Sequence, residues 1–196
     1  MDQDSLARFL VISSAKHDHL CPRQVLGVRM ALAAARKLSL EVPRRDKRLL
    51  VIVETDGCFV DGIEAVTGAT VGHRTLRVED YGKVAATFID VGNSTAVRIS
   101  PGADIRNKAS LFSPDEQQVY SAQLKAYKIM PDHILLTIQP VQTSTSLEKI
   151  ISHPGLRAIC TRCGEEIINE REVLSGDRVL CRSCADAGYY KAIERM

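Results

Sequence analysis

Four of the six cysteines lie near the end of the chain, in the pattern Cys160-x2-Cys163-x17-Cys181-x2-Cys184. Two Cys-x2-Cys pairs at this separation are typical of a structural zinc site, because thiolates bind zinc strongly and each pair forms a short chelating knuckle. Two disulfides or four free thiols are the alternative. We favour the metal, since the N-terminus lacks the plan of a secretory signal and disulfides are rare in reducing compartments.

A second group of metal-ligating residues lies near the start of the chain, in the pattern His17-x-His19-x-Cys21. Alternate residues of an extended segment point to the same side, so these three side chains could face one cleft. A helix predicted to begin at Pro22 would place its positive end beside Cys21, which favours a thiolate. A small core cysteine and two solvated histidines are the alternative reading.

Cys58 lies near the start of another predicted helix, and Asp61 follows three residues later on the same face. Two helix starts, each with a cysteine, together with a histidine pair would form a site for a metal, an anion or a reactive thiol. The spacing alone does not bring Cys58 and Asp61 to the histidines, because the two cysteines are far apart in the chain.

Hydrophobic periodicity and chain breakers predict the elements that must position these residues. The predicted helices are Asp2–Ile12, Pro22–Leu38, about Asp56–Thr67, and one that a capping box at Ser113 opens and that ends near Ile129. The predicted strands are Leu49–Glu54, Val84–Asp90, Thr95–Ile99 and His133–Gln139. This order lacks regular strand–helix alternation, so we expect an α+β fold with helices packed on a mixed or antiparallel sheet.

A change of composition over residues 142–155 divides the chain. We expect an α+β core domain at residues 1–145 and a zinc-finger module at residues 156–196. The module is too short to fold on apolar burial alone, and a bound metal would supply the missing stability. Within it we expect a hairpin tip at Ser175-Gly176-Asp177 and a closing helix over Ala185–Ile193.

The charge balance limits the classes of function. The 196-residue chain has 26 basic and 24 acidic side chains and a formal net charge of +2, which argues against a protein that coats a polyanion. The module from Arg157 carries seven side chains of each sign, which disfavours nucleic-acid binding. No apolar run reaches membrane-spanning length and the N-terminus is acidic, so we expect a cytoplasmic protein.

Three segments form a recognisable set in chain order: Lys16–Pro22 with Gly27-Val28-Arg29, Val53–Ile63 with Val66-Thr67-Gly68, and Asp80-Tyr81-Gly82-Lys83. They resemble the motifs of the formylmethanofuran dehydrogenase E-subunit family, and the cysteine module resembles the treble-clef zinc finger that many members carry. The resemblance implies that the histidines and two cysteines face the family's cleft, where a metal has been proposed. The residues that map there are His17, His19, Cys21 and Cys58, with Asp61 at a motif position nearby.

The resemblance implies a metal-binding accessory protein of one-carbon or molybdo- and tungsto-enzyme metabolism, related to methanogenesis. It would carry a structural zinc ion and a second transition metal or a small ligand in the cleft. Its expected partners are oxidoreductase subunits or a small molecule, and we expect a homodimer and no membrane. One alternative is a stand-alone metal- or thiol-dependent enzyme with Asp61 or Lys83 as the acid–base group. A zinc-finger nucleic-acid-binding regulator is the second.

Overall fold

The computed structural model describes residues 2–17, 19–144, 147, 155–190 and 193. It divides the chain into two compact units, Met1–Ser144 and Thr145–Met196. The first unit carries the cleft residues, and the second carries the four terminal cysteines. Among the helices of the described residues, none is long and apolar enough to cross a membrane.

The first unit is built on a five-stranded sheet with the strand order β2-β1-β3-β4-β5. Its strands are β1 Leu49–Val53, β2 Leu76–Val78, β3 Ala86–Asp90, β4 Thr95–Pro101 and β5 Leu136–Val141. β1 and β2 run parallel, and the other neighbouring pairs are antiparallel. The sheet is therefore mixed, and the predicted α+β class is confirmed.

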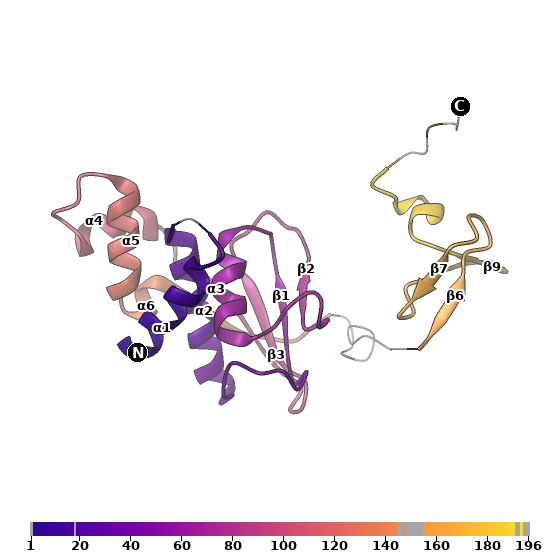
Figure 1. Cartoon of the computed structure of the whole chain (residues 1–196), viewed down its shortest axis with the longest axis horizontal. Helices are drawn as coiled ribbons and strands as arrows, with labels where there is room; N and C mark the ends of the chain where they lie inside the picture. Colours follow the sequence, from indigo (N-terminus) through magenta and orange to yellow (C-terminus); the bar gives the residue numbers. More distant parts are fainter. Residues whose placement is uncertain (1, 18, 145–146, 148–154, 191–192, 194–196) are drawn as a thin grey trace. The chain divides into compact units, whose positions relative to one another are not determined.

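Helices cover this sheet, as Figure 1 shows for α1, α2 and α3 beside β1 and β3. The helices of the unit are α1 Gln3–Ser14, α2 Pro22–Leu38, α3 Cys58–Thr67, α4 Ile105–Phe112, α5 Val119–Ile129 and α6 Asp132–Leu135. α2 contacts α1, α3, α5 and β4, and its residues from Gln24 to Ala35 are buried. An Ala- and Val-rich helix suits this central place, because small side chains let neighbouring elements pack closely on several sides.

The core is aliphatic, as expected for a chain with 5% aromatic residues. Val25, Val28 and Met30 of α2 are fully buried in one cluster with Val51 of β1 and Phe88 of β3. In the register of the sheet, Val51 lies opposite Phe88, so the side chains of alternate strand residues meet the helices on one face. The core of the first unit is therefore formed between α2 and the sheet.

The helix predicted to open at Ser113 is wrong in its start. Ser113 ends α4, and its carbonyl accepts the Glu116 N–H at 3.1 Å in a turn, so α5 begins only at Val119. The short helix α4 and the three-residue strand β2 were not predicted, because short elements carry too few periodic residues. The strand predicted from His133 begins at Leu136, since the preceding residues form the single helical turn α6.

The described strands of the second unit form two hairpins. Its strands are β6 Arg157–Ile159, β7 Glu166–Ile168, β8 Val173–Ser175 and β9 Arg178–Leu180. β8 and β9 pair around Gly176-Asp177, which confirms the predicted hairpin tip. The closing helix predicted over Ala185–Ile193 is wrong. A π-type turn over Ser183–Ala187, interrupted by Asp186 at φ 66°, takes its first residues, and Gly188–Tyr190 are not helical. Residues 191–192 of that prediction lie outside the described part of the chain.

Candidate functional site

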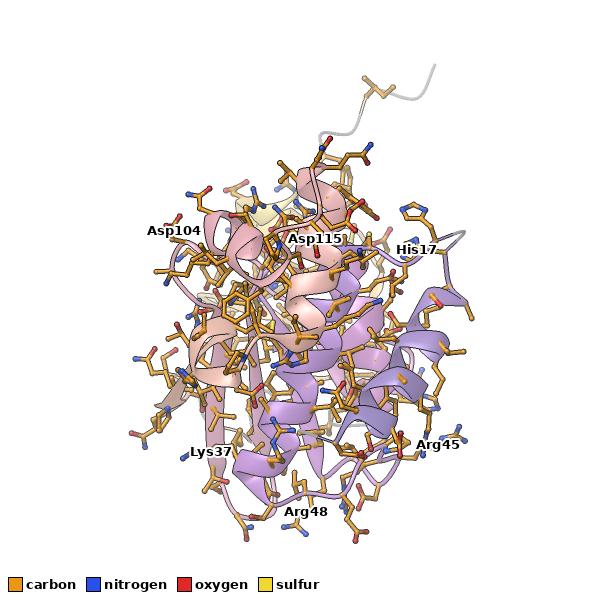
Figure 2. The ribbon with its side chains drawn as sticks, turned by 90° about the vertical axis from the view of Figure 1, so that its left-hand side faces the viewer. His17, Lys37, Arg45, Arg48, Asp104 and Asp115 are labelled. Carbon is orange, nitrogen blue, oxygen red and sulfur yellow. The ribbon has the colours of Figure 1, made fainter. Side chains whose placement is uncertain are left out.

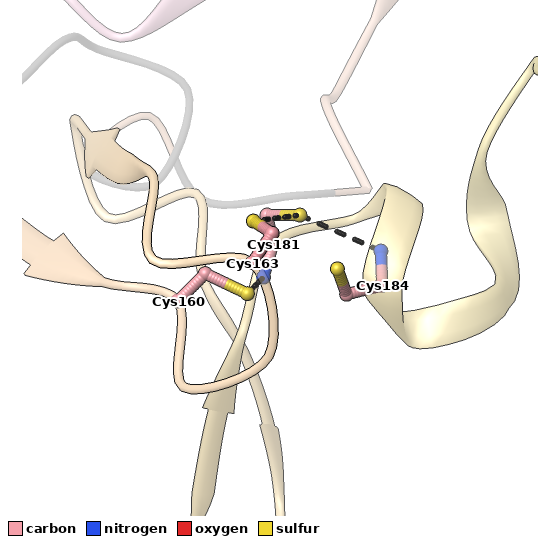
Figure 3. Close-up of side chains that lie close together, drawn as sticks. All are labelled: Cys160, Cys163, Cys181 and Cys184. Atoms are coloured by element: carbon pink, nitrogen blue, oxygen red, sulfur yellow. Dashed lines mark hydrogen bonds between the residues drawn. The ribbon is translucent and has the colours of Figure 1, made fainter. Parts of the chain in front are cut away.

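The four terminal cysteines gather at one point of the second unit (Figure 3). Their ligand atoms all lie within 4.8 Å of one another, and the Cys163 and Cys181 sulfurs are 3.9 Å apart. Thiolates bound at about 2.3 Å around a tetrahedral ion lie about 3.8 Å from each other, which matches this separation. The first pair lies in the loop between β6 and β7, and the second follows β9. The cluster therefore fits a tetrahedral metal such as zinc.

Backbone N–H groups point at two of these sulfurs. The Cys181 N–H donates to Cys160 Sγ at 3.3 Å, and the Cys184 N–H donates to Cys181 Sγ at 3.4 Å. Hydrogen bonds from the backbone of Cys163 and Cys181 lower the pKa of Cys160 to about 6. Hydrogen bonding with Cys181 and burial raise the pKa of Cys184 to about 12. One thiolate forms readily and another does not, so a bound cation would be needed to hold all four as thiolates.

A cavity of about 420 Å³ in the first unit contains the cleft cysteines in its lining. Cys21 precedes α2 and Cys58 is the first residue of α3. Apolar side chains line the cavity beside them, among them Leu26, Val84 and Ile105. A concave, mainly apolar space of this size, with a few polar groups converging on it, has the form of a small-ligand site.

Two glycines let α2 and α3 cross closely enough to bring the two cysteines to one cavity. A Cβ at Gly27 would lie 1.9 Å from the carbonyl oxygen of Phe59, and a Cβ at Gly62 would lie 2.4 Å from the carbonyl oxygen of Gln24. The helix backbones are therefore in direct contact, which any larger residue would prevent. This close crossing positions the cleft.

Cys21 is the N-cap of α2 and shares a capping box with Gln24. Its Sγ accepts the Gln24 N–H at 3.4 Å, and its own N–H donates to Gln24 Oε1 at 2.9 Å. Burial raises the pKa of the Cys21 thiol, and the neighbouring Cys58 thiol adds to the rise, whereas the Gln24 N–H opposes it. Two adjacent thiols in a half-enclosed site therefore favour a bound cation or a neutral Cys21.

α5 contributes residues to this cavity that the sequence did not indicate. Tyr120 and Tyr127 line it, and the Tyr120 hydroxyl donates to the Leu20 carbonyl oxygen at 3.2 Å. Burial raises the pKa of Tyr120, and the charges of Cys21 and Cys58 raise it further. No sequence motif marks Tyr120 as a cleft residue. The turn between α4 and α5, and not a local pattern, brings it to the cavity.

His17 and Asp61 form a second pair. His17 lies on the loop after α1 (Figure 2), and its Nε2 is 2.6 Å from Asp61 Oδ2. Lys16 Nζ lies 3.8 Å from Asp61 Oδ1 and also pairs with Glu64. The carboxylate thus orients the imidazole, as carboxylates do for metal-binding or catalytic histidines. His19 is exposed on the same loop.

Four of the five predicted cleft residues form two pairs here rather than one cluster, and His19 belongs to neither pair. Cys21 and Cys58 share the cavity, and His17 contacts Asp61. Within the described residues, the terminal cysteines are the one group of three or more potential ligands whose atoms gather within 4.8 Å. Joint coordination by all five would require the loop that carries His17 and His19 to move, and it stays a prediction.

The segment of this chain that matches a known family includes the cleft residues. The sequence model of a family described as "FmdE, Molybdenum formylmethanofuran dehydrogenase operon" matches residues 16–137, which include every cleft residue named above. A protein of Archaeoglobus fulgidus named "Probable S-adenosyl-L-methionine-binding protein" is 33% identical over 122 residues, 61% of this chain. That match covers 33% of the relative, so this chain spans about a third of its length.

A solved structure resembles most of this chain. It is the crystal structure of a tungsten formylmethanofuran dehydrogenase FmdE-like protein from Syntrophus aciditrophicus, with a TM-score of 0.59 and 19% sequence identity. The superposition covers 95% of each chain. At this identity, the likeness shows a shared fold.

Proposed function

The chain belongs to the FmdE family of formylmethanofuran dehydrogenase proteins, and from that premise we propose that it is a metal-binding accessory protein of one-carbon or molybdo- and tungsto-enzyme metabolism. Its core cleft would hold a transition metal or a small ligand at Cys21 and Cys58, and its terminal cysteines would hold a structural zinc ion. Family membership supports the accessory role, and the cysteine geometry supports metal binding.

The observation that carries the proposal is the pair of cysteines in the wall of the 420 Å³ cavity. Cys21 and Cys58 are brought there by the first turns of two helices that cross at Gly27 and Gly62. Two thiolates favour zinc or another metal that accepts soft ligands. Two protein ligands leave coordination positions open on the metal. Open positions suit a site that exchanges a bound ligand, whereas a structural metal site is closed.

His17 and Asp61 would complete this site. His17 lies on a loop that leads directly to Cys21, so a shift of that loop would carry its imidazole from Asp61, whose Oδ2 is 2.6 Å from Nε2, toward the cavity. Asp61 would hold the ring in the absence of a metal. We include His19 as a further candidate ligand because it lies exposed on the same loop.

A stand-alone thiol-dependent enzyme is the second candidate, and the His17–Asp61 contact favours it. A histidine oriented by a carboxylate can serve as a general base for a cysteine nucleophile. Cys58 is the candidate nucleophile, because it lies one turn before Asp61 on α3. An enzymatic activity that persists after thorough removal of metal, and that the Cys58→Ala substitution abolishes, would favour this candidate over the accessory protein.

The named relative suggests a ligand to test. The protein of Archaeoglobus fulgidus is described as probably binding S-adenosyl-L-methionine, and its matched segment includes 122 residues of this chain. Calorimetric titration of the full-length chain with this compound would test whether the cavity takes it. Because this chain spans about a third of that relative, the rest of the relative's activity is not part of the proposal.

The partners that we propose are oxidoreductase subunits of the same metabolism and a second copy of this chain, in the cytoplasm. Sedimentation and co-purification would test both. The tail, as we call the chain from Arg157 onward, has equal numbers of acidic and basic side chains. This balance argues against a nucleic-acid regulator, because salt-sensitive DNA binding depends on a net positive surface. An electrophoretic mobility shift at physiological salt would revive that alternative.

Zinc titration of the full-length protein tests the central proposal. We expect a tight site that survives Cys58→Ala and a weaker site that this substitution abolishes. His17→Ala should weaken the second site about tenfold, since ligands and their oriented partners each contribute to affinity at this level. His73→Ala is the matched control, because His73 hydrogen-bonds Thr70 away from the cavity lining. A single class of zinc sites, unchanged by Cys58→Ala, would refute the cleft proposal.

A further inference from the structure

Two arginines line the cleft cavity without a carboxylate partner. Arg23 and Arg106 both belong to the lining, and no aspartate or glutamate of the described residues does. In the part of the chain that the structure describes, neither guanidinium forms an ion pair, whereas other arginines of this unit, such as Arg48 and Arg98, are held by carboxylates. The cavity therefore carries uncompensated positive charge at its rim.

The local backbone adds to this charge. Arg23 and Arg106 are each the second residue of a helix, α2 and α4, and no acidic side chain lies in the first turn of either helix. A helix N-terminus contributes partial positive charge within its first turn. The carboxylate nearest to Arg106 in sequence is Asp104, which accepts a hydrogen bond from Asn107 Nδ2 at 2.5 Å and does not line the cavity.

We infer that the cleft selects small molecules that carry a carboxylate or phosphate group, with Arg23 and Arg106 binding that anion while the rest of the ligand packs between Leu26, Val84 and Ile105. The inference rests on the proposed function of the cleft and names the class of its ligand. Guanidinium groups suit this role, because their planar fork donates two hydrogen bonds to one carboxylate or phosphate. Cys58 lies in the same cavity, so its thiol can report which molecules enter.

Alkylation of Cys58 by a matched pair of reagents tests the inference. With both iodoacetate and iodoacetamide, the thiolate sulfur attacks the CH2 carbon, a C–S bond forms, and the C–I bond breaks with release of iodide. The two reagents differ in that only iodoacetate carries a negative charge. We define the charge preference as the rate with iodoacetate divided by the rate with iodoacetamide, measured on the Cys58 peptide of the full-length protein after dialysis against a chelator. A substitution that changes the thiolate fraction of Cys58 changes both rates by the same factor, so it leaves this ratio unchanged.

We expect the double substitution Arg23→Gln and Arg106→Gln to lower the charge preference about fivefold at low salt, with each single substitution giving part of the loss. Arg45→Gln is the control, because Arg45 does not line the cavity. It should leave the preference unchanged. In the wild-type protein, 1 M salt should remove most of the preference, since the Debye length falls to about 3 Å.

An unchanged preference in the double variant, or in wild type between low and high salt, would overturn the inference. The salt comparison needs no variant, so it decides even if a substitution disturbs folding. Failure here is distinct from failure of the proposed function. If the anion preference is wrong, zinc titration still depends on Cys58; if the cleft binds no metal, the alkylation ratio still responds to the arginines.

Discussion

The chain presents cysteine sulfur in two regions that are built in opposite ways. In the tail, four ligand atoms lie within 4.8 Å of one another and leave room for little besides one ion. In the core, Cys21 and Cys58 line a cavity of about 420 Å³. Closed four-thiolate sites are typical of structural metals, whereas sites that act on ligands keep open positions. The contrast supports our proposal that the tail cluster stabilises its own unit and that the cleft binds a ligand.

The two regions also differ in what holds them in place. The described buried core of the tail consists of Cys160, Ile167 and Leu180, so a metal-ligating cysteine is itself part of that small core. The cleft instead depends on the packing of α2 against α3 and the sheet, which requires no metal. Metal removal should therefore unfold the tail and leave the fold around the cleft intact. A packing defect between α2 and α3 should disturb the cleft and leave the tail intact.

Loss of the tail metal should have the largest effect. Replacing Cys181 with Ser should unfold the described tail residues 155–190, because structural zinc sites contribute about 10–16 kcal/mol of binding free energy to modules of this kind. Hydrogen exchange should show lost amide protection in β6–β9 and unchanged protection in α2 and β1. Cys58→Ala is the control that removes a thiol without touching the tail. Persistent tail protection after Cys181→Ser and chelation would show that the module folds without metal.

A packing defect at the helix crossing should come next in size. Gly27→Ala places a methyl group 1.9 Å from the Phe59 carbonyl oxygen, so α2 and α3 must separate. We expect a loss of about 3 kcal/mol in the core's free energy of unfolding, the upper end for overpacking, together with weaker metal binding at Cys58. Urea denaturation and zinc titration measure the two effects. Gly72→Ala is the control, since nothing lies within 4 Å of the place its methyl group would take, and the tail should be unaffected by either change.

Acid should weaken the core through Asp90, a buried carboxylate of a kind that the described tail residues do not include. Asp90 is fully buried and accepts two hydrogen bonds from Arg48, at 2.8 and 2.9 Å. This contact holds the pKa of Asp90 below its usual range, so its stabilisation is complete at neutral pH and disappears as pH falls through that lowered pKa. Asp90→Asn should cost about 2 kcal/mol at pH 7. The difference from wild type, measured by core hydrogen exchange, should shrink below about pH 4; a constant difference would mean that the charge is not responsible.

Tyr120→Phe should have the smallest effect and should act on the cleft alone. The substitution removes the hydroxyl that donates to the Leu20 carbonyl oxygen at 3.2 Å. One hydrogen bond contributes about 1 kcal/mol, so the core should lose about this much stability or less. Alkylation of Cys58 should nevertheless quicken about twofold to fivefold, because the contact that joins α5 to the cleft loop is lost. An effect on tail protection would contradict the separation of the two regions.

Spacing along the chain was enough to predict the tail site. Two short knuckles bring their own cysteines together, and one hairpin tip at Gly176 brings the knuckles to each other. The helix at Pro22 was equally predictable, because proline, a capping residue and a run of small apolar side chains indicate the same start. The central strands β1, β3 and β4 followed from apolar runs between clear breaks.

The cleft could be predicted only in part, because tertiary contacts form it. Alternation suggested that His17 and Cys21 face one side, but the loop directs His17 toward Asp61 while Cys21 caps α2. Gly62 of the helix crossing and Tyr120 of α5 carry no local signal of their roles. The capping-box pattern at Ser113 misled for a similar reason: the turn between α4 and α5 uses that serine as the end of one helix instead of the start of the next.

X-ray anomalous scattering near the zinc edge, from crystals of the full-length protein equilibrated with zinc, tests the central claim most directly. We expect one peak bound by the four terminal cysteines and a second peak about 2.3 Å from the Cys21 and Cys58 sulfurs, with a position open to water or ligand. A peak at the terminal cysteines with no metal and no bound molecule beside Cys58 would contradict this claim.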